Sequence, residues 1–291
     1  MTDKTESTVL VLGATGMLGN AMLRFLADSP GIHVFGSARN MAGVRLLRKD
    51  LLERVHVGVD VENPDAVAKL LGSVRPHAVI NCIGLVKQLV DVDDPLATLT
   101  INALLPHRLS RLCSLVGARL VHVSTDCVFA GTKGMYREDD VPDAQDLYGR
   151  SKLLGEVTNG THAVTLRTSF IGHELGSAHG LVGWFLAQQG SVRGYRKAVF
   201  SGLPTVELAR IIRDHVLPRP ELCGLYQVSA NPIDKLALLQ LVAREYGHDI
   251  DIVTNEHMAI DRSLDSTRFR NATGYLPPDW DELVRRMHAF G

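Results

Sequence analysis

The sequence predicts an α/β fold in which a doubly wound parallel sheet carries helices on both faces. Short apolar runs alternate with helical patterns along the first part of the chain, and a glycine-rich turn joins the first run to the first helix. The first run, 8–13, is continuous and bounded by glycine, which is typical of a strand buried on both faces. Strands that alternate with helices favour parallel pairing, and right-handed crossovers then favour the doubly wound arrangement.

The expected elements follow from this alternation. Strands are expected at 8–13, 32–35, 55–59, 78–82 and 119–124. Helices are expected at 18–26, 44–54, 64–73, 96–116 and 147–158. These ten segments make five strand–helix pairs, the repeating unit of a parallel sheet.

Composition excludes several classes of function. The 291 residues carry 31 basic and 32 acidic side chains, a balance that gives no reason to expect nucleic acid or a charged membrane as a partner. The N-terminus is polar, and no apolar segment reaches the length of a membrane helix. The four cysteines lie far apart in sequence, so we expect reduced thiols in a cytoplasmic protein. No metal site is expected, because His173 and His179 lack the spacing of two ligands on one helix face.

The glycine-rich turn, Gly13-Ala-Thr-Gly16-Met-Leu-Gly19, predicts a dinucleotide-binding (Rossmann) domain, because it ends a strand and opens a helix. Gly13 permits the tight turn, Gly16 lets the backbone approach a pyrophosphate, and Gly19 lets the helix pack closely on the strand. Free N–H groups at the start of the helix would bind the phosphates. The residues expected to contact the cofactor here are Gly13, Thr15, Gly16, Met17, Leu18 and Gly19.

The ends of the next strands predict which dinucleotide binds. Arg39 lies where NAD-binding domains carry an acid for the ribose 2′-hydroxyl, and a guanidinium pairs well with a 2′-phosphate. We therefore predict NADP (as NADPH), with NAD possible if Arg39 is a solvated surface charge. Asp60 and Val61 are expected beside the adenine ring. The fourth strand is expected to bring further residues past the middle of the cofactor, namely Asn81, Cys82 and Gly84.

Tyr148 and Lys152 predict the catalytic chemistry. They lie four residues apart, which places them on one face of a helix, after a strand that ends in Ser124-Thr125-Asp126. Ketone reduction needs a hydride on carbon and a proton on oxygen, and a phenol with its usual pKa is a reluctant partner at neutral pH. An ammonium about 4 Å away would bring the phenol pKa from about 10 to about 7. We expect Tyr148 to donate the proton, Lys152 to tune it and to hold the nicotinamide ribose, and Thr125 to orient the substrate.

The second part of the chain predicts a smaller lobe. Segment 172–201 is rich in glycine and mixes aromatic with basic side chains, whereas 207–215 looks helical and 225–228 strand-like. We predict a dinucleotide-binding domain over 1–170 and a substrate-binding lobe over 171–291, interleaved with elements that return to the sheet at about 203–230. The lobe would close over the carboxyl edge of the sheet, where ligands of this architecture bind.

Several motifs resemble the extended short-chain dehydrogenases, and more narrowly the dTDP-4-dehydrorhamnose reductase family. Beside the glycine turn they are Ser124-Thr-Asp-Cys-Val-Phe-Ala-Gly131, Tyr148-Gly-Arg-Ser-Lys-Leu-Leu-Gly-Glu156, Leu166-Arg-Thr-Ser169, Gly202-Leu-Pro-Thr205, Arg262-Ser-Leu-Asp265 and Pro278-Asp-Trp280. The resemblance implies reduction of a 4-keto-6-deoxy nucleotide sugar by NADPH, with Thr125, Tyr148 and Lys152 as the triad. It also implies, by analogy alone, a possible homodimer.

The chain departs from the family around the expected sugar site. Cys127 stands where the family usually carries Tyr, and Lys87 and Gln88 lie in a segment that replaces an alanine-rich string. The residues expected to contact substrate are Lys87, Asp126, Trp184 and Arg193, with Arg196 and Lys197 as further candidates for a diphosphate. For the basic residues the alternative is a surface charge, and for Trp184 it is a core aromatic.

Two alternatives to a reductase stay open. A nucleotide-sugar epimerase or 4,6-dehydratase would use the same scaffold, although dehydratases carry Asp-Glu after the threonine and this chain has Asp126-Cys127. The regulatory beta subunit of methionine adenosyltransferase is also similar, and it acts by binding. The retained Thr, Tyr and Lys favour catalysis.

Overall fold

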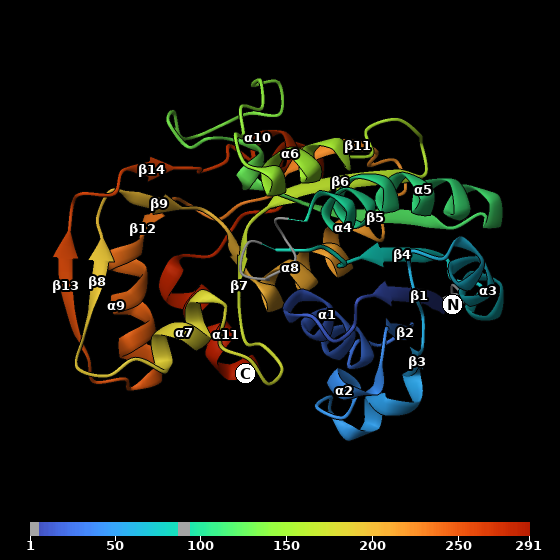
Figure 1. Ribbon diagram of the computed structural model, residues 1–291, viewed down its shortest axis with the longest axis horizontal. Coiled ribbons are helices and arrows are strands. Elements are labelled where there is room, and N and C mark those ends of the chain that lie inside the picture. The colour runs from blue at the N-terminus through green and yellow to red at the C-terminus, as the bar shows by residue number, and fades with distance from the viewer. Residues whose placement is uncertain (1–5, 87–93) are drawn as a thin grey trace.

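The centre of the protein is a seven-stranded parallel sheet (Figure 1). The computed structural model describes residues 6–86 and 94–291. The strands lie in the order β11 (Gly224–Gln227), β6 (Ala163–Thr168), β5 (Arg119–Thr125), β4 (Ala78–Asn81), β1 (Ser7–Leu12), β2 (Ile32–Ala38) and β3 (Val55–Val57). The chain thus runs outward from β1 to one edge, returns past β1, and then runs to the other edge. This order confirms the predicted doubly wound fold.

Helices cover both faces of the sheet because the strands are apolar on both sides. In β1, Val9 and Val11 pack into one hydrophobic cluster, whereas Leu10 and Leu12 pack into another. Helices α1 (Met17–Ala27) and α8 (Thr205–Ile211) contribute to the first cluster. Helices α3 (Pro64–Val74) and α5 (Leu105–Val116) contribute to the second. Successive strand residues point to opposite faces, so a continuous apolar run predicts this double coverage.

The five predicted strands are confirmed, but two predicted helices end early or break. Segment 44–54 is not one helix: α2 (Met41–Val44) stops, and a 3₁₀ turn, η1 (Lys49–Arg54), follows. Arg48 separates them in an extended conformation, and its guanidinium binds Asp28 and Asp50 instead. Segment 96–116 is helical throughout, as α4 (Pro95–Thr98), the π-helical η3 (Leu99–Leu104) and α5.

The predicted helix 147–158 is four residues too long. Helix α6 (Leu147–Leu154) ends at Gly155, where the carbonyl oxygen of Asn102 approaches so closely that a Cβ would lie 1.9 Å from it. The chain then leaves the helix, and the backbone N–H of Val157 donates to the Thr165 hydroxyl on β6. The sequence did not predict β6, because Thr165 and Arg167 interrupt its apolar pattern. All six of its residues are nevertheless buried.

The rest of the chain forms a smaller lobe beside the carboxyl edge of the sheet, on the left in Figure 1. Strand β8 (Ser191–Tyr195) pairs with β13 (Asp251–Asn255), and β9 (Ala198–Phe200) lies between β12 (Ile233–Asp234) and β14 (Ile260–Asp261). The remaining elements are η4 (Asp126–Val128), β7 (Phe170–Ile171), α7 (Leu181–Leu186), β10 (Leu203–Pro204), η5 (Ile212–Val216), α9 (Lys235–Tyr246), α10 (Thr267–Thr273) and α11 (Trp280–Phe290).

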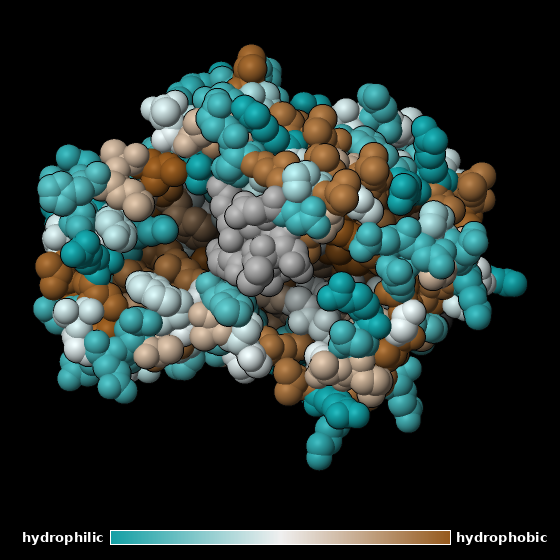
Figure 2. All heavy atoms as spheres, in the orientation of Figure 1, coloured by the Kyte–Doolittle hydropathy of each residue, from teal (hydrophilic) through white to brown (hydrophobic). Residues whose placement is uncertain are grey.

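The elements expected at 207–215 and 225–228 are present in the structure. The helical segment expected at 207–215 is α8 with η5, and the strand expected at 225–228 is β11, which pairs with β6. The face seen in Figure 2 has hydrophilic side chains over most of its outer rim, whereas hydrophobic ones gather along the inner sides of the two parts. The domain boundaries at 170 and 171 stay a prediction.

Candidate active site

The glycine turn has the geometry that a close backbone approach requires. Gly13 has a φ of 79°, in the left-handed region that favours glycine, and its Cβ would lie 2.9 Å from the Ile83 side chain. At Gly19 a Cβ would lie 2.0 Å from the Gly13 carbonyl oxygen. Helix α1 therefore packs closely on the end of β1 because Gly19 lacks a side chain, while Gly13 permits the turn between them. The predicted roles of Gly13 and Gly19 agree with these contacts.

The start of α1 is suited to an anion. Gly16 precedes the helix without a side-chain cap, and the first turn contains no acid. A Cβ at Gly16 would meet only the Gly13 carbonyl oxygen, at 3.5 Å. The N–H groups of the first turn and the helix dipole thus face an open approach. Leu18 is buried in the core, so only its backbone could contact a ligand, while Thr15 packs against Gly43 of α2.

The ends of β2 and β3 lie next to each other. Arg39 follows β2 and is exposed, and its guanidinium makes no ion pair with any residue of 6–86 or 94–291. After β3, the N–H of Val59 donates to the carbonyl of Ala38, which brings this loop beside the end of β2. Asp60 is exposed and accepts from the N–H of Glu62, and Val61 is half-buried. The structure thus brings Arg39, Asp60 and Val61 to the carboxyl edge of the sheet.

The end of β4 adjoins the catalytic helix. The amide of Asn81 is fully buried: it bonds to His122 Nδ1 at 3.1 Å and accepts from the N–H of Ile83. Asn81 therefore shapes the loop that follows it, whose residues Cys82, Ile83 and Gly84 are partly buried. A Cβ at Gly84 would lie 3.8 Å from Lys152 Nζ. Burial raises the pKa of the Cys82 thiol to about 12, against the positive charge of Lys152.

The predicted triad comes together where β5 ends and α6 begins. Gly149, the residue after Tyr148, lets α6 lie against the end of β5, since its Cβ would be 2.3 Å from the Cys127 carbonyl oxygen. Lys152 is 5% exposed and its ammonium donates to the Val123 carbonyl at 2.9 Å. Tyr148 is half-buried and shares a side-chain hydrogen bond with Thr125. The Thr125 hydroxyl oxygen also accepts from the N–H of Cys127.

Burial, rather than the ammonium, dominates the electrostatics of Tyr148. The prediction that Lys152 lowers the phenol pKa to near 7 is wrong, because desolvation raises the pKa of Tyr148 above its usual value. Cys127 adds to this rise, and the hydrogen bond with Thr125 opposes it. Burial lowers the pKa of Lys152 to about 8, while the charges of Glu156 and Cys82 oppose that fall.

Asp126 links the triad to the lobe. It is buried, and burial raises the pKa of its carboxyl. The positive charge of Arg262 and hydrogen bonds from Cys127, Thr125 and Ser169 oppose this rise. Arg262 lies between β14 and α10 and donates through Nε to the Phe129 carbonyl at 2.7 Å. Asp126 therefore lies where the sheet and the lobe meet.

Sequence reasoning missed Asn102, a fully buried residue of the π-helical η3. Its amide accepts from the N–H of Leu85 and donates both to the Leu85 carbonyl and to the Ser151 hydroxyl. It thereby ties the loop after β4 to α6. A lone amide inside the run Thr100-Ile-Asn-Ala-Leu-Leu105 was the available signal, and π-helical turns are frequent at functional sites.

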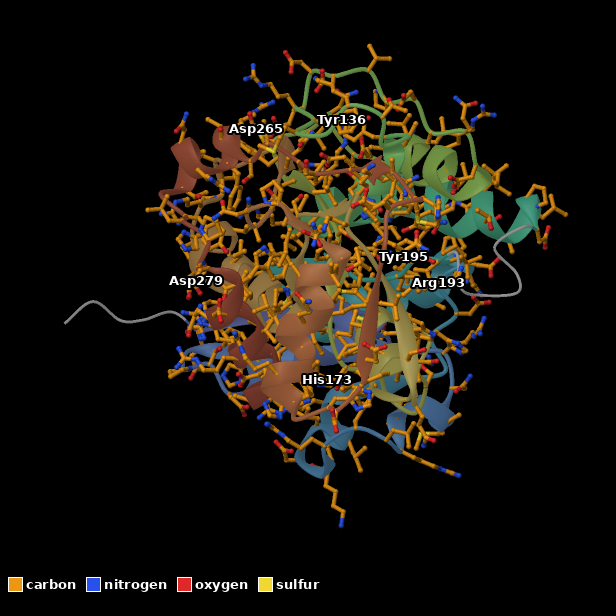
Figure 3. The ribbon with its side chains drawn as sticks, turned by 90° about the vertical axis from the view of Figure 1, so that its left-hand side faces the viewer. Tyr136, His173, Arg193, Tyr195, Asp265 and Asp279 are labelled. Carbon is orange, nitrogen blue, oxygen red and sulfur yellow. The ribbon has the colours of Figure 1, made fainter. Side chains whose placement is uncertain are left out.

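The lobe contains a cavity of about 270 Å³ that joins two predicted substrate residues, Trp184 and Arg193. Figure 3 shows Arg193 and Tyr195 beside each other on β8. The cavity is lined by His179, Leu181, Trp184, Arg193, Tyr195, Lys235 and Leu239. Arg196 and Lys197 do not line it, and Lys197 pairs with Glu256. Lys87 and Gln88 lie outside the described residues.

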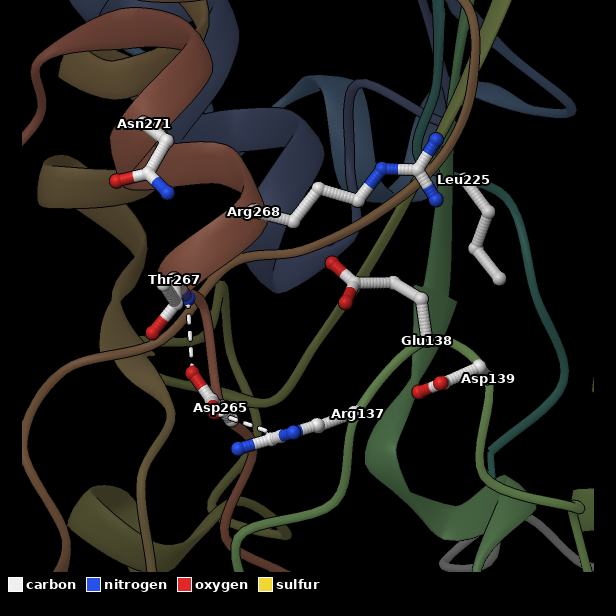
Figure 4. Close-up of a pocket in the computed structure, with 8 residues that line it drawn as sticks. All are labelled: Arg137, Glu138, Asp139, Leu225, Asp265, Thr267, Arg268 and Asn271. Carbon is white, nitrogen blue, oxygen red and sulfur yellow. Dashed lines mark hydrogen bonds and ion pairs between the residues drawn. The ribbon is translucent and has the colours of Figure 1, made fainter.

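A second cavity, of about 590 Å³, lies at the edge strand β11 (Figure 4). Charged side chains dominate its wall: Arg137, Glu138, Asp139, Asp265 and Arg268, with Leu225, Thr267 and Asn271. Arg137 pairs with Asp265 at 3.3 Å. None of the residues predicted to contact cofactor or substrate lines this cavity, so it does not belong to the predicted site.

In the described part of the chain, no group of three or more His, Cys, Asp or Glu side chains is arranged to hold a metal ion. Over the same residues, no helix combines the length and apolar character needed to cross a bilayer. None of the four cysteines, all of which lie in the described residues, forms a disulfide.

A comparison with family models matches residues 7–202 to the RmlD substrate binding domain. The chain belongs to this family. A dTDP-4-dehydrorhamnose reductase of Escherichia coli is 25% identical over 96% of each chain. The methionine adenosyltransferase 2 subunit beta of Xenopus laevis is 34% identical over 54% of this chain, and the match spans less than half, 45%, of that relative's length.

Solved structures agree with the observed fold. The dTDP-4-dehydrorhamnose reductase of Bacillus anthracis, solved in complex with NADP, superposes with a TM-score of 0.81. It is 20% identical, and the match covers 100% of both chains. The RmlD-family resemblance inferred from the motifs is therefore confirmed.

Proposed function

We propose that this RmlD-family chain is an NADPH-dependent reductase of a 4-keto-6-deoxy nucleotide sugar. One observation carries the proposal: Thr125, Tyr148 and Lys152 meet at the carboxyl edge of the sheet, beside the loop that contains Gly84. Parallel doubly wound sheets bind their ligands at this edge. The full-length similarity to a dTDP-4-dehydrorhamnose reductase supports the substrate class.

The residues present fit a dinucleotide. The turn at Gly13 and Gly19 admits no Cβ, and the uncapped start of α1 offers N–H groups to a pyrophosphate. Arg39, exposed and without an ion pair among the described residues, would bind a 2′-phosphate, and Lys152 would hold the nicotinamide ribose. When bound, the reduced nicotinamide supplies the hydride.

Tyr148 is suited to give the proton. Its raised pKa keeps the phenol protonated at neutral pH, so the proton needed for reduction is present. The same rise makes the phenol a weaker acid than a free tyrosine. Thr125, which already shares a hydrogen bond with the phenol, would hold the substrate carbonyl oxygen within reach of it. The neutral hydroxyl of Thr125 orients the oxygen without adding charge. Asp126 adjoins this position from the start of η4.

The lobe cavity would hold the nucleotide end of the substrate. Trp184 and Tyr195 offer aromatic faces for a base, and Arg193 and Lys235 offer cations for a diphosphate. Lys87 stays a further candidate for the sugar.

A turnover assay tests the proposal. Purified protein would be mixed with NADPH and a panel of 4-keto-6-deoxy sugars linked to dTDP, UDP or GDP, and loss of the reduced nicotinamide absorbance would be followed. We expect consumption with at least one sugar and none without sugar. If the protein binds NADPH but oxidises it with none of the sugars in the panel, the proposal is contradicted.

The second candidate is a binding role, favoured by the similarity to methionine adenosyltransferase beta subunits. Such a role predicts a stable complex with a methionine adenosyltransferase catalytic subunit and a change in that enzyme's rate. It predicts no loss of function when Tyr148 is replaced by Phe. Size-exclusion chromatography of the mixture separates the two candidates.

A further inference from the structure

Glu156 occupies a buried position directly behind the catalytic helix. Its side chain is 4% exposed, and the residue lies two positions past the end of α6. It accepts hydrogen bonds from the Ser124 hydroxyl at 2.7 Å and from Arg167 Nε at 2.7 Å through Oε1, and from Arg167 Nη2 at 2.8 Å through Oε2. A bidentate, fully buried pair of this kind fixes geometry on both sides.

The two partners of Glu156 belong to the strands that build the site. Ser124 lies between Val123, whose carbonyl accepts from Lys152, and Thr125 of the triad. Arg167 lies on β6, and its guanidinium stacks over the Phe129 ring at 5.3 Å. One carboxylate thus joins the end of α6, the end of β5 and the neighbouring strand.

Glu156 also offsets the cost of burying the positive charge of Lys152. The ionisable groups that act on Lys152 are Cys82 after β4 and Glu156 after α6, both of which favour its ammonium form. Neutral His122 on β5 feels the Lys152 charge in return, and Tyr148 lies one turn away on the same helix. The thiol of Cys82 stays protonated because of its raised pKa, so Glu156 is the carboxylate that balances the ammonium.

We propose that Glu156 is a positioning residue of the catalytic site, whose carboxylate fixes the end of β5 and keeps Lys152 positively charged. The effect of Glu156 on catalysis rests on the proposed function, whereas its effect on the protonation of Lys152 does not. Without the carboxylate, less negative charge offsets the desolvation of Lys152, so the pKa of Lys152 falls further and the ammonium loses its proton at lower pH. Binding of a cofactor ribose through that ammonium then weakens at neutral pH.

The direct test is the pKa of Lys152 in the protein without substrate. Lysine labelled with ¹³C at Cε would be titrated by NMR, with the Lys152 signal assigned by its loss in Lys152→Met. We expect a midpoint near pH 8 in the parent protein. In Glu156→Gln, which keeps the shape and the acceptor oxygen, we expect a midpoint lower by about one pH unit or more.

A matched control separates this effect from general damage. Glu207 is another buried glutamate, paired with Arg286 at 2.7 Å and with the Tyr275 hydroxyl at 3.3 Å. Glu207→Gln should lower the melting temperature comparably and leave the Lys152 midpoint unchanged. If Glu156→Gln does not fold, Glu156→Gln with Arg167→Gln removes both buried charges and avoids a lone guanidinium. An unchanged Lys152 midpoint in folded Glu156→Gln overturns the proposal. If only the double variant folds, its midpoint is compared with that of Arg167→Gln, which keeps the carboxylate, and equal midpoints overturn the proposal.

NADPH affinity gives the functional readout. Fluorescence titration across pH should show that affinity falls as pH rises through the Lys152 midpoint, and that this fall begins at lower pH in Glu156→Gln. Because neither measurement uses a sugar, a chain that reduces no sugar would sink the proposed function alone. An NMR midpoint that moves while turnover is absent would leave the role of Glu156 standing.

Discussion

The sheet and the lobe build their parts of the site in different ways. On the sheet side, backbone atoms meet so closely that Gly19 and Gly149 have no room for a Cβ, and Gly13 adopts a positive φ. On the lobe side, the cavity is made of side chains such as Trp184, which is 39% exposed, and Arg193. The difference teaches that the proposed cofactor and proton-transfer site depends on close backbone packing, whereas the proposed substrate pocket depends on exchangeable side chains. Substitutions in the two regions should therefore fail in different ways.

The largest effect is expected at Tyr148, the proposed proton donor. Tyr148→Phe removes the hydroxyl and keeps the ring, so NADPH should bind as before while kcat falls by about 10²–10⁴-fold. Steady-state kinetics and a cofactor titration on the same preparation check this. If kcat of Tyr148→Phe stays within a factor of about three of the parent value, Tyr148 is not the proton donor.

The next effect concerns the backbone of the sheet side. In Gly19→Ala the new Cβ would lie 2.0 Å from a carbonyl oxygen, so α1 must shift, at a cost of about 1–3 kcal/mol. We expect a lower melting temperature and weaker NADPH binding together. Gly72→Ala on α3 is the control, because its Cβ meets nothing within 4 Å and should stabilise the helix slightly. Equal behaviour of the two variants would contradict the close-packing account.

Substitutions in the lobe cavity should change KM for the nucleotide sugar rather than the stability of the protein. Trp184→Ala removes an aromatic wall of the cavity, so KM for the nucleotide sugar should rise by about tenfold, the equivalent of ~1.4 kcal/mol, with kcat nearly unchanged. Melting temperature and NADPH affinity should stay at the parent values. A loss of cofactor binding in this variant would mean that the two regions are not separable.

The smallest effect is expected at Arg39, a side-chain contact on the sheet side. Arg39→Ala should raise KM for NADPH several-fold and leave KM for NADH almost unchanged, because only the former carries a 2′-phosphate. Comparing the two KM values checks the change. If the preference for NADPH over NADH does not change, Arg39 does not contact the 2′-phosphate and other residues determine the choice of cofactor.

The sequence could predict what depends on backbone and spacing. The turn at Gly13 and Gly19, the positions of the first five strands and the helical spacing of Tyr148 and Lys152 can be read from residue types and their spacing. Strand β6 was not predicted because Arg167 interrupts its apolar pattern. The burial of Arg167 is explained by its ion pair with Glu156, which lies outside the strand. The pKa of Tyr148 was predicted in the wrong direction because the extent of burial is a property of the folded chain. The cavity at Trp184 and Arg193 depends on packing between α7, β8 and α9, which no local pattern encodes.

Transfer of an isotopic label tests the central claim most directly. The protein would be supplied with NADPH deuterated at the transferable position of the nicotinamide and with the 4-keto-6-deoxy nucleotide sugar that it consumes fastest. The account predicts one deuterium at C4 of the product sugar by NMR, formed by the parent protein and not by Tyr148→Phe. A product without deuterium at C4, or equal labelling with Tyr148→Phe, would contradict it.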